Sequence, residues 1–92
     1  MPKMDFQPWP VEDAAAALNA ALATDDLSRV MATLGTIARA KSMRQVAADT
    51  GLGRESLYKS LAPTGRPEFA TVLKVLPSLG LRLCVTPIED AR

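Results

Sequence analysis

The amino-acid sequence predicts an all-α domain with one short C-terminal β-strand, from its composition and from the spacing of its apolar residues. Of the 92 residues 48% are apolar and only 4% aromatic, and Ala and Leu dominate, which favours helices over sheets. Apolar residues then recur at helical spacing in successive stretches of the chain. A chain of this length has room for one modest hydrophobic core.

The first two helices are expected at about residues 11–23 and 27–40. Glu12 and Asp13 fall in the first turn of the first helix, where carboxylates interact favourably with the helix dipole. The polar residues 24–26 end the first helix and begin the second. The second helix has the stronger apolar face, so we expect it to form the centre of the core.

Two short helices joined by a tight corner follow. Ser42 and Gln45 have the spacing of a capping box, which predicts a third helix from Met43. This helix ends before Gly51, because glycine readily takes the left-handed conformation found after a helix C-terminus. A fourth helix is expected at about residues 54–62.

A fifth helix is expected at about residues 68–79, with Pro77 in its last turn. Proline cannot donate a backbone hydrogen bond, here to Leu73, so we expect a kink or an end near Leu76. Residues 81–86 then alternate apolar and polar side chains, as in a half-buried strand. A lone strand requires a partner. We therefore expect two subunits to pair through Leu81, Leu83 and Val85.

The chain divides into an extended lead-in at residues 1–10, a helical domain at 11–80, and the strand and tail at 81–92. The lead-in contains Pro2, Pro8 and Pro10, which oppose regular structure. It has no signal-peptide pattern, and no apolar run approaches the ~18 residues of a membrane span, so we expect a cytoplasmic protein.

The residue types argue against an enzyme, a metal site and any cofactor. There is no His, and Cys84 is the single cysteine, so a structural zinc site and an internal disulfide are not expected. We interpret Cys84 as an inert thiol rather than a redox switch. Asp49 and Glu55 are not expected to form a catalytic pair, because one ends a helix, the other begins the next, and no phosphate-binding loop lies nearby.

Charge is unevenly distributed along the chain. Residues 1–26 have one base and five acids, whereas residues 39–74 have seven bases and three acids. The second region therefore has the sign needed to approach phosphates.

The corner between the third and fourth helices has the residues that two steeply crossing helices need: a small residue at the crossing, a turn glycine and apolar anchors. Their spacing resembles that of the helix-turn-helix in phage lambda repressor and Cro-type regulators, over residues 27–79. The resemblance implies a five-helix, lambda-repressor-like domain. The residues that carry it are Val46, Ala47, Gly51, Leu52 and Leu57.

A closer resemblance is to the probable addiction-module antidote proteins, which are HigA-like antitoxins. It is carried by the run LGTIARAKSMRQVAADTGLGRESLYKSLAPTGRPEFATVLKVLPSLGLRL at residues 34–83. The resemblance implies a homodimer that binds its own operator and represses its module. It also implies direct neutralisation of an mRNA-cleaving toxin of the RelE/HigB type.

The residues themselves indicate how DNA would be bound. The fourth helix would enter the major groove N-terminus first, and two-fold symmetry implies a palindromic operator. Glu55 could instead complement the helix dipole, and Tyr58 could be a packing residue. The expected base contacts are Arg54, Glu55, Tyr58 and Lys59. The expected contacts to the DNA backbone are Arg39, Lys41, Ser42, Arg44, Ser56 and Arg66.

We expect the acidic N-terminal region to contact the toxin, through Phe6, Trp9, Glu12 and Asp13. The two aromatic residues could instead anchor the lead-in to the core. Two further interpretations stay open: a phage-type repressor without a toxin, and a helical module that binds only protein.

Overall fold

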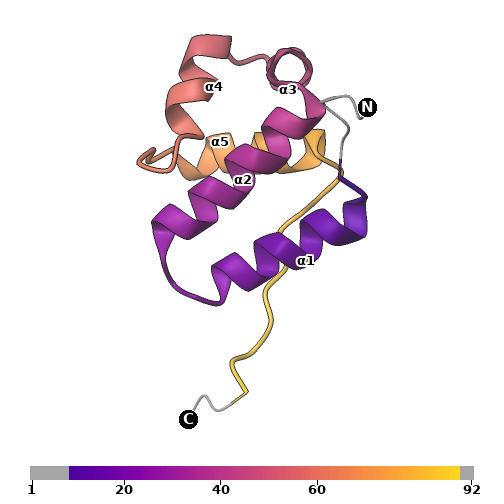
Figure 1. Cartoon of the computed structure of the whole chain (residues 1–92), viewed down its shortest axis with the longest axis vertical. Helices are drawn as coiled ribbons and strands as arrows, with labels where there is room; N and C mark the ends of the chain where they lie inside the picture. Colours follow the sequence, from indigo (N-terminus) through magenta and orange to yellow (C-terminus); the bar gives the residue numbers. More distant parts are fainter. Residues whose placement is uncertain (1–8, 90–92) are drawn as a thin grey trace, which may run out of the picture.

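The computed structural model describes residues 9–89, which form five helices and a C-terminal segment without regular structure (Figure 1). The helices are α1 (Val11–Leu22), α2 (Leu27–Lys41), α3 (Met43–Thr50), α4 (Arg54–Ser60) and α5 (Phe69–Ser78). The five predicted helices and the all-α class are therefore confirmed. Among the described residues, no helix has the length and apolar character to cross a membrane.

The connection between α1 and α2 satisfies its own polar groups. The Asp26 carboxylate accepts from the backbone N–H groups of Ser28 at 3.0 Å and Arg29 at 3.4 Å, which caps α2. Thr24 Oγ1 donates to the carbonyl of Ala21 at 2.6 Å and accepts from the N–H of Asp26 at 3.1 Å. Helix α1 can therefore turn back and lie along α2 (Figure 1).

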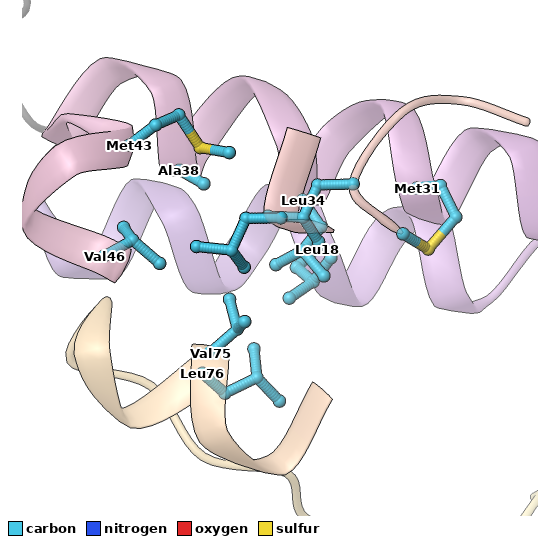
Figure 2. Packing of buried hydrophobic residues seen from close by; sticks show 10 residues of the cluster. Leu18, Met31, Leu34, Ala38, Met43, Val46, Val75 and Leu76 are labelled. Carbon is cyan, nitrogen blue, oxygen red and sulfur yellow. The ribbon is translucent and has the colours of Figure 1, made fainter. Parts of the chain in front are cut away.

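The hydrophobic core has α2 at its centre, as the sequence predicts. Figure 2 shows Val75 and Leu76 extending from α5 towards the side chains of α2 and α3. Helix α1 contributes Leu18 to this cluster. Its buried members are Leu18, Met31, Leu34, Ala38, Met43, Val46, Leu57, Leu61, Val75 and Leu76.

Two corrections concern the C-terminal part of the chain. Helix α5 continues through Pro77 to Ser78 instead of ending near Leu76, because only the bond to Leu73 is lost so close to the helix end. The predicted strand at 81–86 is wrong, since the described residues include no second strand with which it could pair.

A Schellman-type turn ends α5 instead. Gly80 has φ = 78°, and its N–H donates to the carbonyl of Pro77 at 2.9 Å. The N–H of Leu81 donates to the carbonyl of Leu76, also at 2.9 Å. The chain then leaves the helices as a segment that projects beyond them (Figure 1).

One glycine of α2 allows a close approach between helices. Gly35 is buried, and a Cβ atom built on it would lie 2.4 Å from the carbonyl oxygen of Leu61, just after α4. That oxygen belongs to the backbone and cannot move aside as a flexible side chain could. Gly35 therefore sets the distance between α2 and the end of α4.

A group of polar side chains joins the C-terminal ends of α2 and α5 to α3. Lys41 Nζ donates to the carbonyl oxygen of Ser78 and lies 3.4 Å from Asp49 Oδ2. The same carboxylate oxygen accepts from Ser78 Oγ at 2.9 Å, and Asp49 Oδ1 accepts from Gln45 Nε2 at 2.8 Å. We call these four residues the Asp49 cluster. It neutralises the charge of Lys41 and satisfies a terminal carbonyl of α5.

The bonds within the Asp49 cluster lower the pKa of Asp49. The amide of Gln45 and the hydroxyl of Ser78 both donate to the carboxylate, and the ammonium of Lys41 lies beside it. Partial desolvation acts to raise this pKa, but the hydrogen bonds outweigh it and the pKa stays below its ordinary value.

We predict that Gly35→Ala lowers the free energy of unfolding by about 1–3 kcal/mol, because α2 must move away from the Leu61 carbonyl. Urea denaturation followed by circular dichroism measures this change. Thr36→Ala, at the next and exposed position, is the matched control and should change stability much less. An unchanged stability in Gly35→Ala would contradict the close approach.

We predict that the Asp49 cluster makes stability depend on pH. A carboxyl whose pKa is lower in the folded state stabilises the fold above its unfolded value of about 3.9, and this stabilisation is lost as the pH falls through the folded pKa. Denaturation measured between about pH 3 and 6 should show a flatter dependence for Asp49→Asn than for the wild type. Asp13→Asn, which removes an acid outside the cluster, should retain the wild-type slope.

Candidate nucleic-acid interface

Ser42 forms the junction between α2 and α3. Its N–H donates to the carbonyl of Ala38 at 3.0 Å, which closes α2, and its Oγ accepts from the N–H of Gln45 at 3.2 Å, which opens α3. Only this half of the predicted capping box forms. The other half is absent because the Ser42 N–H is already used, and the Gln45 amide donates to Asp49 instead.

The corner between α3 and α4 has the conformation that Gly51 predicts. Gly51 has φ = 75°, and its N–H donates to the carbonyl of Ala47 at 2.9 Å. Thr50 Oγ1 accepts from the N–H of Leu52 at 3.3 Å, which stabilises the turn.

Four apolar side chains join this corner to the rest of the domain. Val46 on α3 and Leu57 on α4 are both 0% exposed, within the core around α2. Ala47 and Leu52 are half-buried against the same core. The corner residues are therefore located where two crossing helices need them.

A hollow of about 370 Å³ opens where the end of α2, the start of α3 and the start of α4 meet. Three guanidinium groups line it, together with a hydroxyl at the N-terminus of α3 and a phenol from α4. Five of the six lining residues were predicted as DNA contacts. The lining residues are Arg39, Ser42, Met43, Arg44, Arg54 and Tyr58.

The electrostatics of this arginine hollow favour an anion. Within the described part of the chain, the ion pairs are Arg29 with Asp26 and Lys41 with Asp49, so no carboxylate there neutralises the three arginines. Guanidinium groups form strong, paired hydrogen bonds with phosphate oxygens. The arrangement can therefore bind phosphates of a nucleic-acid backbone.

The other predicted DNA contacts are distributed over three places. Glu55, Ser56 and Lys59 are exposed on α4, outside the lining of the arginine hollow. Arg66 lies in the connection before α5, where it lines two other hollows, one of them with Ser56. Lys41 is bonded within the Asp49 cluster, where its bonds compete with any phosphate.

The predicted protein-contact residues lie on other elements. Glu12 and Asp13 are exposed in the first turn of α1, and Trp9 is exposed just before it. Phe6 lies outside the described residues. In Figure 1, α2 separates α1 from α4.

The three residues predicted to pair subunits differ in exposure. Leu81 is half-buried against the core, whereas Leu83 and Val85 are exposed. Pairing through this segment was not tested by the single chain and stays a prediction.

The structure also joins polar residues behind the arginine hollow that no sequence pattern predicted. Ser78 and Asp49 are 29 residues apart, so no local pattern could join them. The spacing of Gln45 and Asp49, four residues apart on a helix, was a usable signal for their hydrogen bond. Within the described residues, no three potential metal ligands cluster together.

A family model described as a probable addiction module antidote protein matches residues 10–87. An uncharacterized protein of Haemophilus influenzae is 48% identical over 68 residues, which cover 74% of this chain and 70% of that protein. No solved structure matches the chain significantly.

Proposed function

Because the chain belongs to the probable addiction module antidote protein family, we propose that it is a DNA-binding antitoxin whose α3 and α4 act as a helix-turn-helix. The observation that carries the DNA-binding proposal is the arginine hollow at the junction of α2, α3 and α4. It presents three cations beside the first turn of α4, the end of the helix that would enter the major groove.

The proposed division of DNA contacts follows from the hollow. Arg39 and Arg44 bind the phosphate backbone together with the hydroxyl and helix start at Ser42. Arg54 begins α4 and reads guanine, with Glu55 and Lys59 exposed on the same helix. Tyr58 bonds a phosphate from the wall of the hollow.

Repression requires a dimer in this proposal. Two copies related by a two-fold axis place their α4 helices in major grooves about 34 Å apart on a palindromic operator. Autorepression of the module follows if the operator lies before the antidote gene.

An antidote implies a cognate toxin, and we propose that this toxin is of the RelE/HigB type. The exposed acids Glu12 and Asp13 and the exposed indole of Trp9 contact it on the side of the domain that carries α1. A basic, RNA-cleaving toxin suits such an acidic surface. The family description favours this interpretation over a phage-type repressor without a toxin, and the arginine hollow favours it over a module that binds only protein.

We predict that Arg54→Ala weakens operator binding by about 1–3 kcal/mol and relaxes the preference at one base pair. Arg44→Gln should weaken binding to all sequences and lower the salt slope by about one unit. Arg82→Gln removes the same charge from the C-terminal segment and serves as the control. Fluorescence anisotropy over a series of salt concentrations measures these changes. Unchanged affinity and preference in Arg54→Ala would remove α4 from the DNA interface.

We predict that Glu12→Gln combined with Asp13→Asn weakens toxin capture more than operator binding, because both acids lie on α1 and outside the arginine hollow. The toxin encoded with the antidote, purified after co-expression, is the ligand for calorimetry. Glu68→Gln, which removes an exposed acid just before α5, is the control. Equal loss of DNA and toxin binding would indicate a general defect instead of a toxin contact.

A further inference from the structure

The C-terminal segment after α5 exposes apolar side chains that the fold does not use. Val85 is 98% exposed and Ile88 is 76% exposed, although both are β-branched apolar residues. Leu83, at 37%, is also among the exposed large apolar residues. Successive exposed apolar groups on one short segment are characteristic of a surface that another molecule covers.

The beginning of this segment forms one wall of an apolar hollow. The hollow has a volume of about 260 Å³ and lies between α1 and residues 81–84. Leu22 of α1 and Leu83 both line it and both remain exposed. The apolar surface therefore continues from α1 along the segment towards Val85.

The backbone of the segment is available for pairing. The N–H of Leu81 is the last in the described chain that donates to another described backbone group. Beyond it, residues 82–89 contribute no hydrogen bond to the rest of the described domain. An extended segment of this kind can become an edge strand when it meets the free edge of another sheet.

Pro87 determines which edge of the segment can pair. In an extended chain, successive N–H groups point to opposite edges, and Pro87 has none to donate. The edge on which Pro87 and Val85 lie is therefore interrupted. The opposite edge, with the N–H groups of Arg82, Cys84, Thr86 and Ile88, is complete.

The charge beside this surface indicates the chemistry of the partner. Residues 9–28, which contain α1, have four acids and no base. Asp26 is paired with Arg29, and Arg82 is the base that lines the hollow. Glu12 and Asp13 lie in the first turn of α1, and Asp25 and Asp26 follow its last turn. A partner with a basic surface therefore complements this side of the domain.

We propose that residues 82–88 and the adjoining hollow on α1 form the docking surface for the cognate toxin, which adds a free strand edge to the segment. The inference rests on the proposed antitoxin function and names the contact which that function needs. It assigns to the toxin the segment that the sequence predicts to pair two subunits. The basic surface of the toxin faces the acids of α1, and its apolar side chains cover Leu22, Leu83 and Val85. The arginine hollow involves none of these residues, so DNA and toxin can be bound together.

Proline substitutions at neighbouring positions test this pairing. Thr86→Pro removes an N–H from the complete edge, whereas Val85→Pro removes one from the edge that Pro87 already interrupts. Calorimetry with the purified toxin of the same module should show affinity lowered about tenfold or more by Thr86→Pro. Val85→Pro should lower it no more than Val85→Ala, which removes the same apolar contact, and the side-chain control Thr86→Ala should lower it by less than about threefold. Both residues are exposed outside the helices, so helix content and operator binding should be retained.

The outcomes separate this inference from the function on which it rests. If the wild type binds toxin and Thr86→Pro binds it equally well, the segment is not the paired strand. If the protein alone is a dimer in sedimentation and Thr86→Pro makes it a monomer, the segment pairs with a second copy and the inference is overturned. If the wild type does not bind the toxin at all, the antitoxin function fails as well.

Discussion

The burial of Val46 and Leu57 is the constraint on which the candidate site depends. Helices α3 and α4 have eight and seven residues, whereas isolated helices shorter than about 12–15 residues are marginal in water. Both side chains are fully buried in the core around α2, so tertiary packing holds these two helices in place. The positions of Arg44 and Arg54 follow from that packing, because each lies on one of the two helices.

The Asp49 cluster determines which basic side chains near the arginine hollow remain available to a ligand. Lys41 bonds to the carboxylate of Asp49 on α3 and to the carbonyl of Ser78 at the end of α5. These bonds neutralise its charge and join α5 to α3. Arg39, two residues earlier on α2, lines the arginine hollow instead. Two bases that are almost adjacent in the sequence therefore have different roles, one structural and one suited to an anion.

The domain separates its two proposed binding activities in space. The arginine hollow lies at the junction of α2, α3 and α4, whereas the acids and exposed apolar residues belong to α1 and the C-terminal segment. Opposite charges on separate surfaces suit two partners of opposite charge, and they limit binding of the wrong partner at either surface. Repression and toxin capture could then operate in a single small domain.

Local sequence patterns determined the five helices, the turn at Gly51 and the cap at Ser42, because apolar periodicity, positive φ and capping act within a few residues. They also identified most of the residues that line the arginine hollow. Only the tertiary structure decided that Lys41 bonds to the end of α5, since its acceptor on Ser78 lies 37 residues away. It also decided that residues 81–86 form no strand in the single chain, because a strand exists only where another backbone lies beside it.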